Sequence, residues 1–192
     1  MPARAGLDRE LVVRAAADLL DDSFGRVLTL SDLASKLGVR APSLYNHVDG
    51  LDDLYQAISL YSTRELGTCI GRAAIGRSGE DAVFAIADAY RRFAKERPNL
   101  YLTSQRAPSP MEETRAEVSD EILDVLRRVL APFELTDDEQ IHAMRALRSL
   151  IHGFVSLELV GGFGIPIDVD NSFNYLVAMY ATGLRHRGDG AQ

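Results

Sequence analysis

The sequence predicts an all-α protein in which three short helices at the N-terminus precede a larger helical domain. Apolar residues recur at helical spacing in almost every segment, which is typical of amphipathic helices. Capping residues, glycines and prolines separate these segments, and no stretch convincingly indicates a β-strand. The fold class therefore follows from the period of the apolar residues and from the breaks between segments.

The composition limits the class of protein. A chain of 192 residues with 46% hydrophobic residues can form one or two domains with a substantial core. No apolar run approaches the roughly 20 residues of a membrane span, and the first residues do not resemble a secretory signal. Cys69 is the single cysteine, so neither a disulfide framework nor a cysteine zinc site is expected. These features predict a cytoplasmic protein with no membrane association, no metal and no cofactor.

The first helix is expected over residues 9–24. Asp8 can cap its N-terminus, and Gly25 follows its last residue. One side of this helix is apolar and would cover the two helices that follow, which makes a three-helix unit. This side consists of Leu11, Val12, Ala15, Ala16, Leu19, Leu20 and Phe24.

Residues 29–48 predict two short helices joined by a tight turn. Thr29 is a suitable N-cap, and Asp32 stands three residues later, as in a capping box. Gly38 can adopt a positive φ at little steric cost, so it would end the first helix. The inner face of that helix is formed by Leu30, Leu33, Ala34 and Leu37.

The second of these helices has the features of a DNA-reading helix. Pro42 fits its opening turn, and Leu44 and Val48 are spaced to face inward. Asn can form two hydrogen bonds with adenine, Ser can bond any base, and Tyr and Ser hydroxyls suit phosphate oxygens. An ordinary helical hairpin in an all-α core is the alternative interpretation. The candidate DNA-binding residues are Thr29, Arg40, Ala41, Pro42, Ser43, Tyr45, Asn46 and His47.

The charge of the chain argues against indiscriminate binding of nucleic acid. The formal net charge is −7, and residues 1–55 contain nine carboxylates against six lysines and arginines. Neutralisation of phosphates supplies much of the affinity of DNA-binding proteins, so this contribution should be modest here. Specific contacts and dimer avidity would have to contribute more. A helix-turn-helix protein that acts as an adaptor without binding DNA therefore stays open as an alternative.

Further helices are expected behind the helix-turn-helix. A glycine-rich loop at residues 75–80, two prolines (Pro98 and Pro132) and a loop at 161–166 mark the breaks. Thr136 and Glu139 form a second capping box. The expected helices cover about residues 51–74, 79–97, 98–101, 111–131 and 137–160, and a final helix capped by Asp170, Asn171 or Ser172 runs to about Arg185.

The helix at 137–160 and the final helix are apolar around most of their circumference. Such a helix must be buried on several sides, which requires either a central position in a monomer or a partner subunit. Two such helices from each of two subunits would form the four-helix interface of a homodimer. A polar stripe on the first of them could line a ligand cavity, follow the dimer seam or meet water. This stripe consists of Arg145, Ser149, His152 and Ser156.

No catalytic constellation is evident. The sequence lacks an H-E-x-x-H motif, a glycine-rich phosphate loop and a G-x-S-x-G elbow. The four histidines are spread along the chain, and His142 and His152 are too far apart on one helix to share a metal. No catalytic and no metal-binding residues are predicted, and a small all-α enzyme is the less favoured alternative.

The strings LGVRAPSLYNHV at 37–48 and DGLDDLYQAI at 49–58 resemble the recognition segment of the tetracycline-repressor (TetR) family of bacterial regulators. The family often has a lysine where this chain has Leu51, which puts one phosphate contact in doubt. The string IHGFVSLELVGGFG at 151–164 resembles the C-terminal domain of a TetR subgroup named for a Trp-His-Gly motif, with Ile151 in place of the tryptophan.

This resemblance implies a homodimer with a DNA-binding domain at residues 1–55 and a helical ligand-sensing and dimerisation domain at 56–192. Its partners would be a palindromic double-stranded DNA operator and a small-molecule effector of unknown identity, which would release the protein, most simply a repressor, from the operator. The helix at 51–74 would transmit the ligand state. Aromatic and Met residues at helical spacing more often form plain core, which is the alternative for the candidate effector-binding residues Tyr90, Phe93, Tyr101, Met111, Met144, Arg148 and His152.

Overall fold

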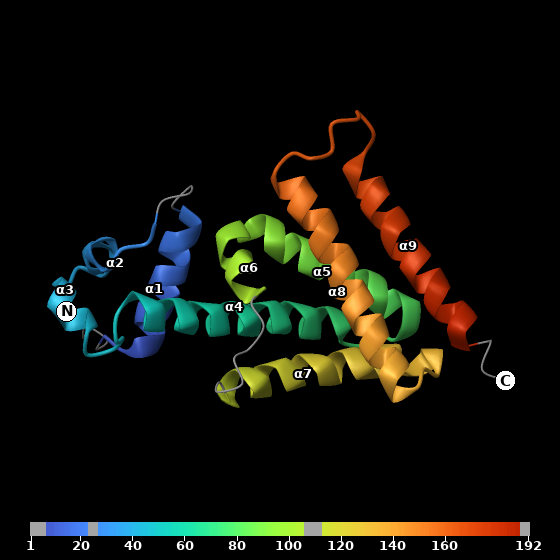
Figure 1. The fold of residues 1–192 in the computed structure, drawn as a ribbon, viewed down its shortest axis with the longest axis horizontal. Coiled ribbons are helices and arrows are strands. Elements are labelled where there is room, and N and C mark those ends of the chain that lie inside the picture. The colour runs from blue at the N-terminus through green and yellow to red at the C-terminus, as the bar shows by residue number, and fades with distance from the viewer. Residues whose placement is uncertain (1–6, 23–26, 106–112, 189–192) are drawn as a thin grey trace. The chain divides into compact units, whose positions relative to one another are not determined.

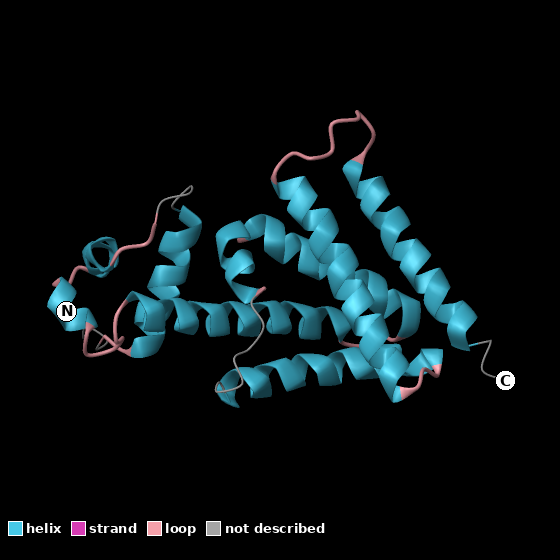
Figure 2. Cartoon of the chain, viewed as in Figure 1, coloured by secondary structure: helices cyan, strands magenta, loops and turns pink. Residues whose placement is uncertain are grey.

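The computed structural model describes residues 7–22, 27–105 and 113–188, and every regular element in these ranges is a helix (Figures 1 and 2). The prediction of an all-α fold is confirmed. The predicted helix end at Gly25, the candidate Met111 and the break at residues 108–110 lie outside the described residues. None of the helices in the described ranges combines the length and the apolarity needed to cross a membrane.

The chain forms two compact units. Unit 1 comprises Met1–Glu65 and Arg97–Ser109, and unit 2 comprises Leu66–Glu96 and Pro110–Gln192. The long helix α4 (Leu51–Ala74) begins in unit 1 and ends in unit 2. Contacts thus place a short central segment of the chain with the N-terminal helices, a grouping that the sequence does not suggest. A functional boundary at residue 55 stays a prediction.

Unit 1 contains the helix-turn-helix. Its described helices are α1 (Arg9–Asp22), α2 (Leu30–Leu37), α3 (Ala41–Leu44), the first part of α4, and α6 (Pro98–Ser104). Helix α1 packs against both α2 and α6, and α2 packs against α3. Burial of each large apolar side chain in this core contributes about 1.5–3 kcal/mol. The most completely buried ones are Val12, Leu28, Leu33, Leu44, Val48, Leu54, Ile58, Leu100 and Tyr101.

The predicted caps of α2 are confirmed. The Thr29 hydroxyl accepts a hydrogen bond from the Asp32 N–H at 3.1 Å, which satisfies one of the free donors at the start of the helix. At the other end, Gly38 adopts φ 66° and ψ 31°, the left-handed conformation that suits glycine. The Val39 N–H then donates to the Ala34 carbonyl at 3.0 Å, which closes the turn into α3.

Unit 2 is built around α5 (Gly79–Glu96), which packs against α7 (Glu113–Leu130), the 3₁₀ turn η1 (Ala131–Phe133), α8 (Asp137–Leu159) and α9 (Val169–Gly188). Helices α8 and α9 form a hairpin whose connecting loop is visible in Figure 1. Helix α4 comes so close to α7 at Gly67 that an added Cβ would lie 2.8 Å from Cγ1 of Ile122.

Helix α8 begins with the predicted capping box. The Glu139 N–H donates to the Thr136 hydroxyl at 3.4 Å, and the Thr136 N–H donates to Glu139 Oε2 at 3.0 Å. Its buried residues lie on one face, whereas Ala146, Ser149 and Gly153 are exposed. In the described part of unit 2, α5 rather than α8 is therefore the central helix, and α8 keeps a face that the monomer does not cover.

Candidate DNA-binding surface and effector-binding unit

Helix α3 and the turn after it present candidate reading residues to solvent. Leu44 and Val48 are 0% and 2% exposed, so they anchor the segment in the core of unit 1. Tyr45 exposes 59% of its surface, and Asn46 is also exposed. The local fold thus separates two apolar anchors from the polar side chains between them, which is the arrangement a reading helix needs to meet base edges.

The other predicted DNA-binding residues lie before or beside these two. Arg40 and Pro42 are exposed, and Ala41, Ser43 and His47 are partly exposed. Thr29 lies at the start of α2 rather than on α3, and its hydroxyl also donates to the Asp32 carboxylate at 2.6 Å. Seven of the eight candidates therefore belong to one continuous segment. A DNA contact by any of them stays a prediction.

Two basic side chains that could face DNA phosphates are instead held in ion pairs within the protein. Lys36 donates to the Asp22 carboxylate at 3.1 Å, and Arg9 pairs with Asp53. Within residues 27–60, Arg40 is the basic side chain without an ionic partner among the described residues. Leu51, where the family often has lysine, opens α4 and is partly buried. This charge distribution agrees with a small electrostatic contribution to DNA affinity.

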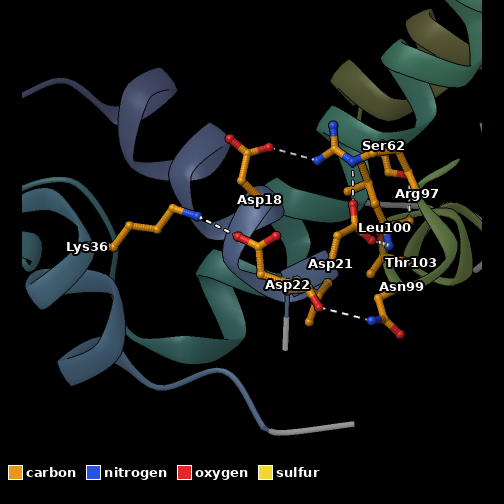
Figure 3. Close-up of polar contacts among 10 residues, drawn as sticks. Asp18, Asp21, Asp22, Lys36, Ser62, Arg97, Asn99, Leu100 and Thr103 are labelled. Atoms are coloured by element: carbon orange, nitrogen blue, oxygen red, sulfur yellow. Dashed lines mark hydrogen bonds and ion pairs between the residues drawn. The ribbon is translucent and has the colours of Figure 1, made fainter. Parts of the chain in front are cut away.

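The C-terminal end of α1 holds α6 through a cluster of polar contacts (Figure 3). The Leu100 N–H donates to Oδ1 of Asp21 at 2.9 Å, and the Asn99 amide donates to the Leu20 carbonyl at 3.0 Å. Arg97 pairs with Asp21 and also with Asp18, the latter at 2.9 Å. Because Arg97 is the N-cap residue of α6 and cannot accept a hydrogen bond through its side chain, Asp21 of α1 caps α6 from outside.

Helix α4 holds the same short helix from a second side. The Ser62 hydroxyl donates to the Leu100 carbonyl at 2.7 Å, and the Ser59 hydroxyl donates to the Thr103 carbonyl at 2.5 Å. Ser62 is completely buried, so its hydroxyl needs this partner. Burial raises the pKa of the nearby Tyr61 hydroxyl. Helix α6 is therefore a structural part of the unit that contains the helix-turn-helix.

The acids at this junction favour the charged form of Arg97. Burial lowers the pKa of Arg97, but the hydrogen bond and charge of Asp21 and the charge of Asp18 outweigh it, so the pKa is raised. Asp22, next in sequence to Asp21, reaches Lys36 of α2 instead (Figure 3). Three of the acids that make residues 1–55 acidic, Asp18, Asp21 and Asp22, are thus used in internal ion pairs.

The predicted effector-binding residues fall into both units. Tyr90, Phe93 and Met144 are buried in unit 2, where Arg148 is exposed and His152 partly exposed. Tyr101 is completely buried in unit 1, so it is not brought together with the others inside one unit. Met111 is not among the described residues. The effector contact stays a prediction for each of them.

Unit 2 contains an ion cluster, with a largely buried Arg91–Glu158 pair at its centre, that the sequence does not predict. Arg91 of α5 donates from Nε and Nη2 to the two carboxylate oxygens of Glu158 on α8, at 2.8 and 2.6 Å. Lys95 also donates to Glu158, and Arg91 Nη2 lies 2.7 Å from Asp170 of α9. The hydrogen bond from Arg91 lowers the pKa of Glu158, against the effect of burial. The signal available in the sequence was a single carboxylate in the mostly apolar stretch 150–160.

Aromatic rings enclose this cluster. The Arg91 guanidinium carbon lies 4.7 Å from the centre of the Phe173 ring and 5.6 Å from that of Phe154. The two rings meet edge to face with centroids 5.1 Å apart. Arg91 therefore ties α5, α8 and α9 together by ion pairing and by cation–π contact.

The α8–α9 hairpin and its connecting loop expose several large apolar residues. Tyr175 and Met179 of α9 expose 70% and 59% of their surfaces. From the polar stripe of α8, Arg145 and Ser149 are exposed, and His152 and Ser156 are partly exposed. The exposed large apolar residues of α8, α9 and their connection are Leu157, Val160, Phe163, Ile165, Ile167, Tyr175 and Met179. An apolar surface of this kind marks an interaction site.

Comparisons with known proteins agree with this architecture. Residues 83–180 match the family model described as tetracyclin repressor-like, C-terminal domain. The chain is 35% identical over 185 residues to an uncharacterized HTH-type transcriptional regulator, Rv0681, of Mycobacterium tuberculosis, with 95% of this chain and 84% of that protein covered. It is 32% identical over 186 residues to another, YobS of Bacillus subtilis, with 96% of each covered.

A solved structure shows the same fold. The transcriptional regulator SCO7222, a TetR from Streptomyces coelicolor, superposes with a TM-score of 0.74 at 22% identity, and 94% of this chain and 99% of that one are covered. The family match extends over half of the chain, and both relatives are similar over nearly all of it. The chain therefore belongs to the tetracycline-repressor (TetR) family of helix-turn-helix transcriptional regulators.

Proposed function

We propose that this protein is a homodimeric repressor that reads a palindromic DNA operator with α3 and leaves it when a small molecule binds. The observation that carries the proposal is the exposure of Tyr45 and Asn46 between the buried anchors Leu44 and Val48. In a dimer on a palindrome, the two reading segments enter major grooves one turn apart, about 34–36 Å, or a multiple of that spacing. Such a protein acts in the bacterial cytoplasm, where the chromosome lies.

The uncovered face of α8 and α9 supports the homodimer. A face with Leu157, Tyr175 and Met179 exposed would be poorly solvated in a monomer. Because a two-fold axis brings the same face of each subunit together, two helices from each subunit would form a four-helix interface there. The small exposed residues Ala146 and Gly153 of α8 would allow close approach of the helices.

The course of the chain supports control by a ligand. Helix α4 passes from unit 1 into unit 2, and the chain returns to unit 1 for α6 before it enters unit 2 again. A ligand that binds one arrangement of the two units more tightly shifts the population toward it. In the proposed mechanism, the ligand-bound arrangement has a spacing of the reading segments that does not fit the half-sites, so operator affinity falls.

Asn46→Ala is expected to weaken binding to the operator about tenfold or more and to relax discrimination at one base position, because a bidentate side-chain contact is lost. Tyr45→Phe should weaken binding evenly across sequences if its hydroxyl meets a phosphate. Binding is measured on an operator fragment recovered from genomic DNA by the unmodified protein. Gln56→Ala, at an exposed amide of α4, is the control and should bind like wild type. If Asn46→Ala and Tyr45→Phe both bind the operator as tightly as the wild type, the reading helix lies elsewhere.

Met179→Glu is expected to convert the dimer into a monomer, because dimerisation would bury a carboxylate without a partner. Sedimentation of the full chain at a concentration where the wild type is dimeric measures the change. Leu102→Glu adds the same charge at an exposed apolar residue of α6 and should leave the dimer intact. If Met179→Glu forms a dimer as stable as that of the wild type, the subunit interface lies on another face.

A role as an adaptor that does not bind DNA stays a second candidate function. It is favoured by the small number of basic side chains that are free for phosphate contacts in the described part of unit 1. It predicts no enrichment of any DNA sequence by the dimeric protein. The operator experiment separates the two functions.

A further inference from the structure

Helix α3 is too short to hold its own orientation. It covers only Ala41–Leu44, a single turn, and isolated helices of that length are unstable in water. Leu44 and Val48 anchor its inner side, and residues 45–47 between them form a turn rather than a continuation of the helix. Side chains that read bases must be held within a fraction of an ångström, so a further restraint is needed.

That restraint is a three-part contact made by Arg9, the first residue of α1. Its Nη1 donates to the His47 carbonyl at 2.5 Å and to Asp53 Oδ2 at 2.9 Å. Its Nη2 donates to Asp53 Oδ1 at 2.7 Å, so the pair is bidentate. The His47 N–H is itself bonded to the Leu44 carbonyl at 2.9 Å. Both backbone groups of His47 are therefore engaged in the described structure.

Asp53 restrains the chain on the other side of the same turn. Its Oδ2 accepts the Asp49 N–H at 2.9 Å, just before Gly50, which has φ 112°. The hydrogen bond from Arg9 lowers the pKa of Asp53, while burial opposes this shift, so the carboxylate stays ionised at neutral pH. One ion pair thus joins the start of α1, the end of the reading segment and the first turn of α4.

A carboxylate near bound DNA weakens affinity unless it is neutralised, so Asp53 requires a structural reason for its position. Its ion pair with Arg9 supplies both the neutralisation and the geometry. Asp52, the neighbouring acid on α4, is exposed and provides a comparison.

We infer that Arg9 and Asp53 form a positioning pair that sets the sequence specificity of the reading segment without touching a base. This inference rests on the proposed DNA-binding function. The pair fixes the His47 carbonyl, and through it the direction of Tyr45 and Asn46 toward the base edges. Loss of the pair leaves the helices folded and frees the turn, so the operator is read less well while non-specific binding persists.

Asp53→Asn tests the inference by the direction in which it changes operator affinity. Removal of a negative charge alone would strengthen binding to any DNA, whereas the inference predicts that operator affinity falls roughly tenfold, as expected when hydrogen bonds to a charged partner are lost. Affinity for a scrambled duplex of the same composition should stay equal or rise slightly. Asp52→Asn, the matched control, should lose no preference for the operator over the scrambled duplex.

Arg9→Met separates positioning from a direct phosphate contact. We expect Arg9→Met to lose its preference for the operator, while the slope of log affinity against log salt concentration (the salt slope) stays as in the wild type. The double variant with Asp53→Asn should lose little more operator affinity than Arg9→Met alone. Equal weakening on both duplexes, with the salt slope reduced by about one, would show a phosphate contact and overturn the inference. Circular dichroism at the assay temperature verifies that each variant is folded.

Two further outcomes distinguish this inference from the proposed function. If the wild type prefers no operator over the scrambled duplex, both fail. If the wild type prefers the operator and Asp53→Asn keeps the full preference, the positioning pair alone is refuted.

Discussion

Arg91→Met is expected to lower the free energy of unfolding by about 3 kcal/mol, because it leaves a largely buried carboxylate without its main partner. The side chains of Arg91 and Glu158 are only 9% and 14% exposed, so solvent screens their interaction weakly. The cation–π contacts with Phe154 and Phe173 are lost as well. Lys95 still pairs with Glu158 and keeps the loss near the lower end of the range for broken buried pairs. Chemical denaturation of the full chain measures the change.

The adjacent Arg92→Met is the control for this experiment. Arg92 pairs with Asp88 at 3.1 Å on the surface, where both side chains are more than half exposed. Its loss should change the free energy of unfolding by no more than about 0.5 kcal/mol. Equal effects of the two substitutions would show that the Arg91 cluster does not stabilise unit 2.

The same cluster predicts a pH dependence. Arg91 holds the pKa of Glu158 below its ordinary value of 4.5. A group with a lowered pKa in the folded state stabilises the protein above its ordinary pKa, and this stabilisation is lost as the pH falls through 4.5 and below. As the pH falls from neutral through 4.5, the free energy of unfolding should therefore decrease more for the wild type than for Arg91→Met.

Asp21→Ala is expected to destabilise unit 1 by about 2–3 kcal/mol, since a buried N–H and a guanidinium lose their acceptor. The Asp21 side chain is 12% exposed and caps α6 while it pairs with Arg97. Asp18 still pairs with Arg97, so the loss of the cap at Leu100 should dominate. Hydrogen exchange of the full chain should show faster exchange of the α6 amides at residues 100–104, together with a lower midpoint of unfolding.

Asp22→Ala provides the matched control one residue away. Asp22 is 72% exposed and pairs with Lys36, so its removal should cost less than about 1 kcal/mol and leave exchange in α6 unchanged. If Asp21→Ala also leaves α6 exchange unchanged, α6 is held mainly by its buried side chains and by the serines of α4.

Local sequence rules predicted the helices and their ends. Thr29, Gly38 and Thr136 act within four residues along the chain, so their roles can be inferred without a tertiary structure. The buried positions of Leu44 and Val48 followed from helical spacing alone. The same rules predicted a longer second helix than the structure has, because α3 ends at Leu44 and residues 45–47 form a turn.

Contacts between distant parts of the chain could not be predicted in this way. Arg91 and Glu158 are 67 residues apart, and Arg97 and Asp18 are 79 apart. Each is an ordinary charged residue on a helix until packing brings its partner near. The absence of a capping side chain at Arg97 was the one local sign that α6 needs an acceptor from another helix. The excess of acidic residues in 1–55 was evident from the sequence. The ion pairs that Asp18, Asp21 and Asp53 form within the protein were not.

Selection of genomic fragments by the purified protein shows whether the α3 segment reads a specific operator. The selection is run at low and at physiological salt, with protein that has been unfolded and refolded to remove any bound ligand. We expect one enriched palindrome whose half-sites are one helical turn or a multiple apart. Absence of any enriched sequence at both salt concentrations, from protein that is folded and dimeric, would show that the α3 segment does not read an operator.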